Sequence, residues 1–291
     1  MRVGMVGLGN IGGHVASNLV ADGHDVTVAD TDPARAAAVE GAIVAGSVAE
    51  VASECAVTIL SLPTPAIVDA VAEEWSAAAP PGAVLVDLST NSPAAVRDLG
   101  ARLEATGHHL VEAPLTGGAV GAEQRRLMFM VGGSDDAVAV VRPVLEPLGR
   151  ACFHLGPLGA GNTMKLVNSL IAYTATWSTL EGLSLAAKSG IGVQQAVEVL
   201  RTGGAGNFFV DRMVEGIDQR GRPTRFALEL AAKDAGLIVE TGDDLGVPTP
   251  TGAALRDVLT RAVDAGLGEA DWSELVAFAE QLGDVTLRWS P

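Results

Sequence analysis

Two polar residues near the start of a long apolar helical pattern have the types and spacing needed for proton transfer. Lys165 and Asn168 are three positions apart, so on a helix they lie on one face. Burial without a partner carboxylate lowers the pKa of a lysine toward the range in which the neutral amine acts as a base. The Asn168 amide could hold a substrate oxygen nearby. The alternative is a lysine that extends from the helix start into solvent, and the spacing alone does not decide between the two.

A glycine run near the beginning of the chain has the spacing of a phosphate-binding turn. Gly7-Leu8-Gly9-Asn10-Ile11-Gly12 joins a predicted strand over 1–6 to a predicted helix over 11–20. The first glycine permits the tight bend, the second lets a pyrophosphate approach the backbone, and the third lets helix and strand pack closely. The positive end of the helix then favours the phosphates. Glycine makes up 35 of 291 residues, so the run alone is a weak signal for a dinucleotide site.

Asp30 strengthens this prediction. It ends a predicted strand that contains Val26 and Val28, about 20 residues past the glycines, as the dinucleotide-binding fingerprint requires. A carboxylate there accepts hydrogen bonds from both ribose hydroxyls and repels a 2′-phosphate. Thr31 follows directly and Arg35 lies a helical turn further on, so the sequence predicts NAD as the cofactor, with NADP as the alternative. The competing interpretation is an ordinary β-α-β turn with a solvated aspartate.

Two more segments could contact a small ligand. Thr116, Gly117 and Gly118 offer consecutive backbone amides and a hydroxyl, which suits a small carboxylate, although an ordinary glycine turn would look the same. Lys233 precedes Asp234 on a predicted helix that is otherwise apolar. The alternative for this pair is a solvated ion pair on the surface.

The first half of the chain alternates strand and helix signals, which suggests how these residues are brought together. Strands are predicted at 1–6, 26–30, 42–45, 57–60, 84–86, 110–111 and 128–131. Repeated β-α units imply a parallel, doubly wound sheet of the Rossmann type, in which ligands bind beyond the carboxyl ends of the strands. Those ends carry Gly7, Asp30, Ser61-Leu62-Pro63, Ser89-Thr90 and Thr116-Gly117-Gly118. Five loops are therefore expected to converge on one crevice.

The second half of the chain has only helical patterns. A long helix, apolar on nearly every side, is predicted from Asn162 to Ser189. Further helices are predicted at 193–201, 226–242, 250–265 and 273–282. We therefore expect an α/β chain in two domains. Residues 1–157 would form an NAD(P)-binding Rossmann domain, and a long helix would join it to an all-α domain for substrate binding and dimerisation at 158–291.

The composition excludes several classes of function. A net charge of −16 argues against nucleic acid or an anionic membrane as a partner, because both require clustered Lys and Arg. The five histidines are scattered without metal-ligand spacing, and neither a nucleophile elbow nor a Walker motif is present. Two cysteines without a pairing pattern, and no apolar run of membrane-spanning length, favour a cytoplasmic location. Few surface charges on the helical domain favour a homodimer or homotetramer.

In this order, and over almost the whole chain, the motifs resemble those of the β-hydroxyacid dehydrogenase family, to which 3-hydroxyisobutyrate dehydrogenase and tartronate semialdehyde reductase belong. Together they are far more specific than the glycine run alone. The matching segments are Gly7 to Gly12, Ser61-Leu62-Pro63, Asp87-Leu88-Ser89-Thr90, Ala113 to Gly118 with Gly121-Ala122, Gly159-Ala160-Gly161 through Lys165 to Asn168, and Lys233-Asp234.

The resemblance implies a role for each matching residue. Lys165 corresponds to the catalytic lysine, which exchanges a proton with the substrate hydroxyl, and Asn168 to the neighbour that helps to fix the substrate. Thr116, Gly117 and Gly118 match the loop that binds the substrate carboxylate. The resemblance implies cofactor contacts for Leu62, Pro63, Thr90 and Lys233, the last of which also lies over the substrate. These positions add to the cofactor contacts predicted above for Asp30 and the glycine run, which consists of Gly7, Leu8, Gly9, Asn10, Ile11 and Gly12. The implied reaction interconverts a small 3-hydroxy carboxylic acid and its semialdehyde or oxo acid.

Two departures from the family pattern leave the substrate open. Thr116 stands where many members have Ser, and Ser169 stands where many have Asn or Gln. Two other functions also remain as alternatives. Imine reductases share the architecture but typically replace the lysine, so Lys165 argues against an NADPH-dependent imine or semialdehyde reductase. A non-catalytic NAD-binding sensor would need neither Lys165 nor Asn168.

Overall fold

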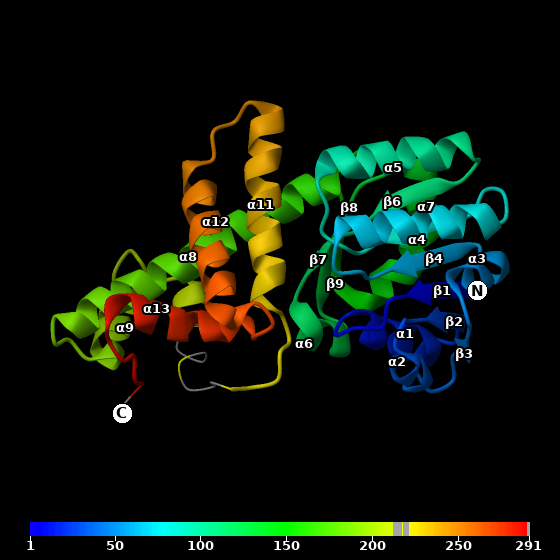
Figure 1. The fold of residues 1–291 in the computed structure, drawn as a ribbon. Helices are drawn as coiled ribbons and strands as arrows, with labels where there is room; N and C mark the ends of the chain where they lie inside the picture. The colour runs from blue at the N-terminus through cyan, green and yellow to red at the C-terminus, as the bar shows by residue number, and fades with distance from the viewer. Residues whose placement is uncertain (212–216, 218–220, 290–291) are drawn as a thin grey trace. The chain divides into compact units, whose positions relative to one another are not determined.

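The computed structural model describes residues 1–211, 217 and 221–289 (Figure 1). The chain forms two compact units, Met1–Leu166 and Val167–Pro291. Helix α8 (Ala160–Lys188) runs across the division, so its first residues belong to the first unit and the remainder to the second. The domain boundary expected at residue 157 falls just before this helix.

The first unit is built on a six-stranded sheet. Its strands lie in the order β3-β2-β1-β4-β5-β6, and all neighbouring pairs are parallel. They are β1 (Arg2–Val6), β2 (Asp25–Ala29), β3 (Ile43–Val44), β4 (Val57–Leu60), β5 (Val84–Asp87) and β6 (His109–Glu112). The strand order reverses between β1 and β4, which is the Rossmann doubly wound arrangement and confirms the predicted fold class. Ligands of such sheets bind outside the carboxyl ends of the strands at this reversal.

Helices cover both faces of this sheet, because its strands are apolar almost throughout. Side chains alternate along each strand, so Val84 and Val86 of β5 pack in one core cluster and Leu85 packs in the other. The helices of the first cluster are α1 (Gly12–Ala21), α2 (Pro33–Ala37) and α7 (Asp135–Leu145). Those of the second are α3 (Val48–Glu54), α4 (Pro65–Ala78) and α5 (Pro93–Ala105).

Short polar side chains begin most of these helices. Asp32, Ser47, Thr64, Ser92 and Ser134 each accept a hydrogen bond from a backbone amide in the helix that follows. Proline stands in the first turn of α2, α4 and α5, where its missing N–H is not needed.

A second, three-stranded sheet in this unit was not predicted. Strand β8 (Leu127–Val131) is antiparallel to β7 (Leu115–Thr116) and parallel to β9 (Gly149–His154). The strand predicted at 128–131 therefore belongs to this small sheet and not to the parallel one. Strand β7 escaped prediction because two residues are too few to show a period. Thr116 thus ends strand β7 of the small sheet, and Gly117 and Gly118 lead from this strand into α6 (Gly118–Glu123).

The second unit is helical in its described part, as the sequence predicts. Leu180, Leu228, Leu259 and Leu275 are fully buried in its core, one from each of four helical segments. Its elements after α8 are α9 (Val193–Thr202), α11 (Leu228–Leu245), α12 (Pro250–Ala262), η2 (Val263–Leu267), η3 (Trp272–Glu274) and α13 (Leu275–Gly283). Within the described ranges, no helix combines the length and apolar content that crossing a membrane requires.

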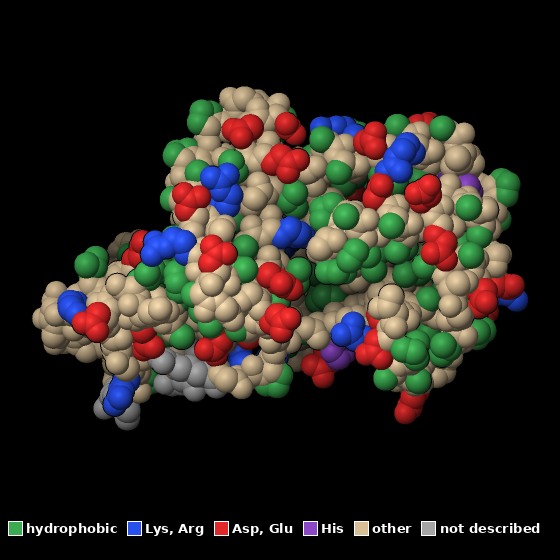
Figure 2. Space-filling view, viewed as in Figure 1, with side chains coloured by type: hydrophobic (Ala, Val, Ile, Leu, Met, Phe, Trp, Pro, Cys, Tyr) green, Lys and Arg blue, Asp and Glu red, His purple; other side chains and the backbone are tan. Residues whose placement is uncertain are grey.

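The surface reflects the acidic composition of the chain. On the face drawn in Figure 2, Asp and Glu side chains are dispersed, with Lys and Arg among them, and do not form one patch. The negative charge on this face is therefore spread over it rather than concentrated.

Candidate functional site

The glycine run adopts the geometry that its spacing predicts. Gly7 has φ of +86°, and a Cβ there would collide with the carbonyl oxygen of Ser61. A Cβ on Gly12 would collide with the carbonyl oxygen of Gly7. At Gly9, by contrast, a Cβ would have no atom within 4 Å, so the backbone borders open space. The outer glycines are required by packing, and the middle one leaves room for a ligand to approach the backbone.

Helix α1 begins directly after this turn without a side-chain cap at Ile11. The amides of a first helical turn carry partial positive charge and favour an anion. Together with the open space at Gly9, this start of α1 fits the pyrophosphate of a dinucleotide.

Asp30 lies at the carboxyl end of β2 and is hydrogen-bonded to the glycine turn. Its Oδ2 accepts from the Leu8 amide at 2.6 Å, and its Oδ1 accepts from the Asp32 amide at 2.8 Å. The Asp30 side chain is 6% exposed, and a guanidinium nitrogen of Arg35 lies 3.9 Å from Oδ1. The carboxylate therefore joins the two loops that follow β1 and β2.

The loops after β4 and β5 are joined in a similar way. The Leu62 amide donates to Ser89 Oγ at 3.0 Å, and the Ser89 amide donates to Asp87 Oδ1 at 2.9 Å. Leu62 and Thr90 are half-buried and Pro63 is exposed. The structure thus brings these three predicted cofactor positions together on two neighbouring loops.

The predicted carboxylate-binding loop is open to solvent. Pairing of Thr116 with Met128 fixes its beginning in the small sheet. Gly117 and Gly118 are exposed and have φ of +123° and +62°, a region that favours glycine. A Cβ at Gly118 would have no atom within 4 Å, so a small ligand could reach this backbone.

Lys165 and Asn168 are both half-buried and share one face of α8. The helix begins at Ala160, two residues earlier than predicted, which makes Lys165 its sixth residue. Lys165 belongs to the first unit and Asn168 to the second.

Glu112, which the sequence analysis did not identify, holds the first turn of α8. This fully buried carboxylate at the end of β6 accepts four hydrogen bonds. The donors are the amides of Gly159 at 2.5 Å, Gly161 at 2.9 Å and Asn162 at 3.0 Å, and Nδ2 of Asn162 at 2.6 Å. One signal could have revealed it: a glutamate ends an apolar strand, and the helix start at Gly159-Ala160-Gly161 lacks a local capping residue.

Burial raises the pKa of Glu112, while the hydrogen bonds from Asn162, Gly161 and Gly159 lower it in part. All four groups that contact the Glu112 oxygens are N–H donors from the start of α8, so the carboxylate form, which only accepts hydrogen bonds, fits these contacts.

Lys233 lies on α11, in the second unit, beside a buried acid. Its Nζ is 3.2 Å from Asp234 Oδ1, and the two side chains are 21% and 4% exposed, unlike a solvated surface pair. The Tyr173 hydroxyl donates to Asp234 Oδ2 at 3.1 Å. Burial and the charge of Asp234 raise the pKa of Tyr173 well above its ordinary value, so the phenol remains a donor.

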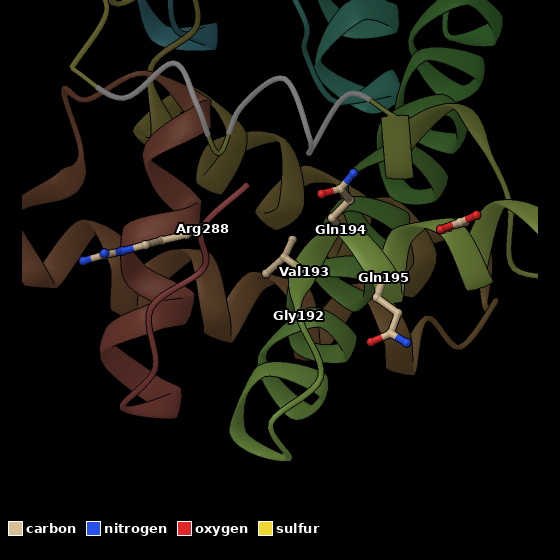
Figure 3. Close-up of a pocket in the computed structure, with 6 residues that line it drawn as sticks. Gly192, Val193, Gln194, Gln195 and Arg288 are labelled. Atoms are coloured by element: carbon tan, nitrogen blue, oxygen red, sulfur yellow. The ribbon is translucent and has the colours of Figure 1, made fainter. Parts of the chain in front are cut away.

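The second unit contains a cavity of about 330 Å³. It is lined at the start of α9 by Gly192, Val193, Gln194, Gln195 and Glu198, together with Arg288 (Figure 3). None of its lining residues is a predicted site residue, and we assign it no role.

Comparisons with known proteins agree with this geometry. A family model described as the NAD binding domain of 6-phosphogluconate dehydrogenase matches residues 2–156. A second, described as the NAD-binding domain of NADP-dependent 3-hydroxyisobutyrate dehydrogenase, matches residues 159–279. The mitochondrial 3-hydroxyisobutyrate dehydrogenase of Drosophila melanogaster is 34% identical, over 94% of this chain and 87% of that protein. The chain belongs to the β-hydroxyacid dehydrogenase family.

Two further members of the family resemble the chain over nearly its whole length. The 2-(hydroxymethyl)glutarate dehydrogenase of Eubacterium barkeri is 31% identical, over 99% of this chain and 97% of that protein. A structure of Mycobacterium tuberculosis 3-hydroxyisobutyrate dehydrogenase with L-serine superposes with a TM-score of 0.86 at 30% identity, covering 95% and 98% of the two chains. As a β-hydroxyacid dehydrogenase, the chain is an oxidoreductase that uses NAD or NADP to act on the carbinol group of a hydroxy acid.

Proposed function

We propose that this β-hydroxyacid dehydrogenase interconverts a small 3-hydroxy carboxylic acid and its semialdehyde or oxo acid, with Lys165 as the general acid and base. One observation carries the proposal. The half-buried Lys165 lies on a helix whose first turn is hydrogen-bonded to Glu112, at the carboxyl end of the dinucleotide-binding sheet.

The proposed proton transfer uses the amine of Lys165. Bound NAD supplies the hydride acceptor for the carbinol C–H. In the oxidation direction the neutral amine takes the hydroxyl proton as hydride leaves the carbon, and in reduction the ammonium returns it. Asn168, on the same face of the helix, donates its amide to the substrate oxygen. General acid–base catalysis of this kind typically contributes about 10²–10⁴-fold in rate.

Thr116, Gly117 and Gly118 are proposed to bind the substrate carboxylate. Consecutive amides on exposed glycines with positive φ form a concave donor surface for an anion, and the Thr116 hydroxyl adds another donor. Lys233 is proposed to contact both the cofactor and the substrate. Holding the carboxylate fixes the carbinol carbon for hydride transfer, which is an orientation effect and not a chemical one.

NAD is the proposed cofactor, in preference to NADP, because Asp30 ends β2. The positions proposed to contact it are the glycine run 7–12, Asp30, Leu62, Pro63, Thr90 and Lys233. A ribose 2′-phosphate beside the Asp30 carboxylate would be repelled. We expect the KM for NADP to exceed that for NAD, and an Asp30→Asn variant to reduce the difference. Asp32→Asn, which alters the cap of α2, is the control and should leave the preference unchanged. A strong preference for NADP in the unchanged protein would overturn the assignment.

The names of the relatives supply three substrates for the first test: 3-hydroxyisobutyrate, 2-(hydroxymethyl)glutarate and L-serine. We propose measuring the absorbance of reduced nicotinamide with these three, and with glycerate and 4-hydroxybutyrate as further small hydroxy acids. The buried Ser169, one turn after Lys165, provides a shorter polar group than Asn or Gln would, so we expect one of these acids to be clearly preferred. Turnover of none of them, despite NAD binding, would favour a cofactor-binding sensor instead.

We also propose that the chain forms a homodimer or homotetramer. Ile171 and Leu185 are 62% and 73% exposed and stand 14 positions apart, on one face of α8, and a row of exposed apolar side chains along a helix favours association. Sedimentation equilibrium would test this, and a monomer at micromolar concentration would contradict it.

A further inference from the structure

The first turn of α8 is joined to the cofactor loops by buried polar side chains that take no part in the proposed chemistry. We call Glu112, Asn162, Asn91 and Asp87 the buried network. Their exposed fractions are 0%, 0%, 4% and 2%.

Hydrogen bonds connect these four residues one after another, from Glu112 through Asn162 and Asn91 to Asp87. Asn162 donates from Nδ2 to Glu112 Oε2 at 2.6 Å and accepts through Oδ1 from the Asn91 amide at 2.8 Å. Asn91 donates from Nδ2 to Asp87 Oδ2 at 2.6 Å. Among the described residues, none donates a hydrogen bond to Asn91 Oδ1. The side chain of Asn91 is therefore linked to the buried network only through the bond from Nδ2 to Asp87.

The last member of the buried network reaches the loops after β4 and β5. Asp87 Oδ1 accepts from the Ser89 amide, and Ser89 Oγ accepts from the Leu62 amide. A continuous path of hydrogen bonds therefore runs from the start of the helix that carries Lys165 to the loops that carry Leu62 and Thr90.

Glycines make room for this arrangement. A Cβ on Gly132 would collide with Glu112 Oε1. A Cβ on Gly161 would collide with the carbonyl oxygen of Met130 and lie 3.1 Å from the Glu112 carboxyl carbon. The helix start can therefore approach the sheet closely enough for one carboxylate to receive several donors at once.

We infer that the buried network positions Lys165 relative to the cofactor loops, so that its members are positioning residues for the reaction. The inference rests on the proposed function, in which Lys165 exchanges the proton. The hydrogen bonds of the buried network favour one arrangement, because a displacement that breaks them leaves further polar groups without partners in a low dielectric. Hydride and proton transfer depend strongly on distance, and a shift of about 1 Å can reduce turnover about 100-fold.

Two variants of different severity test this inference. Asn162→Ala removes the two hydrogen bonds of the Asn162 side chain, one to Glu112 and one from the Asn91 amide. We expect kcat of the folded enzyme to fall about 10- to 100-fold. Asn91→Ala removes only the bond to Asp87, so a smaller loss of about 3- to 10-fold is expected. The KM for the cofactor should change less than about 3-fold in both, since neither residue is proposed to touch it.

The control is Asp271→Asn in the second unit. Asp271 is another buried carboxylate that accepts backbone amides, and its loss should lower Tm while leaving kcat of the folded enzyme unchanged. If Asn162→Ala and Asn91→Ala behaved like this control, with lower Tm and normal kcat, the network would be structural only and the inference would be wrong. Should Asn162→Ala fail to fold, Asn91→Ala decides.

Failure of the inference can be distinguished from failure of the proposed function. If Lys165→Met were inactive while both network variants kept normal kcat, only the positioning role would be lost. If Lys165→Met kept normal turnover, the proposed role of the lysine would fail whatever the network variants did.

Discussion

Glu112 and Asp271 are buried carboxylates with similar local tasks in different units of the molecule. Each accepts hydrogen bonds from three backbone amides, and they are 0% and 3% exposed. Glu112, at the end of β6, accepts from the start of α8, which carries Lys165, and Asp271 stands at the start of η3. The first therefore holds the start of the helix that carries the proposed catalytic residue, whereas the second joins η3 to the backbone at Arg225 and Phe226.

The pKa values of the two carboxyl groups are shifted in opposite directions. Burial raises the pKa of Glu112, and its amide donors offset this only in part. Burial also opposes ionisation of Asp271, but hydrogen bonds from the Arg225 amide and from Ser273 lower its pKa to about 2. Asp271 Oδ1 also accepts a hydrogen bond from Arg222 Nε at 3.0 Å. The comparison teaches that the donors around a buried carboxylate, and not its burial alone, decide how strongly the charged form is favoured.

The largest loss of stability is expected for Glu112→Gln. The new amide group would direct N–H donors at the backbone amides of α8, which are too deeply buried to be rehydrated. We expect the free energy of unfolding to fall by about 2–4 kcal/mol. Urea denaturation of the variant and the unchanged protein measures this. A loss within experimental error would mean that the start of α8 does not depend on this carboxylate.

Asp271→Asn should be less destabilising, with a loss in the free energy of unfolding of about 2 kcal/mol. The shift of the pKa of Asp271 from 3.8 to about 2 corresponds to roughly that free energy. The same denaturation experiment applies. If Asp271→Asn lowered the free energy of unfolding more than Glu112→Gln, the expected order of the two carboxylates' contributions to stability would be wrong.

The pH dependence of stability sharpens the comparison further. The pKa of Asp271 is lower in the folded than in the unfolded chain, so its contribution is complete above about pH 4 and is lost as the pH falls toward 2. The difference in unfolding free energy between the unchanged protein and Asp271→Asn should therefore shrink over this window. A difference independent of pH would show that the ionised carboxylate is not what stabilises η3.

The smallest effect is expected for Tyr173→Phe. The substitution removes the hydrogen bond to Asp234 but keeps the ring contact with Trp272, whose centroid lies 4.8 Å away. We expect a loss of about 1.5 kcal/mol, typical of a hydrogen bond to a charged group. A thermal melt measures it, and an unchanged Tm would indicate that Asp234 is held by Lys233 alone.

The elements that the sequence predicted are those with strong local patterns. The glycine run, the strand ending at Asp30 and the long helix toward Ser189 all show periodicity or fixed spacing over many residues. These patterns were enough to predict the Rossmann sheet and the helical second unit. They also supplied most of the candidate site residues, whose roles stay predictions.

The contacts that escaped prediction depend on residues far apart in the sequence. Glu112 and Asn162 are separated by 50 positions, so no local pattern in the sequence shows that these two residues meet. The pairing of β8 with β7 and β9 was missed for the same reason, because strand partners are chosen by tertiary packing and not by local pattern.

Turnover of a Lys165→Met variant tests the central claim most directly. The control is Lys188→Met, which removes a lysine at the other end of the same helix, where it is paired with Asp284 at 3.1 Å. With the preferred hydroxy acid and saturating NAD, we predict that Lys165→Met lowers kcat by at least about 10²-fold while NADH binding stays near normal. Lys188→Met should keep normal kcat. Normal turnover by Lys165→Met would contradict the account.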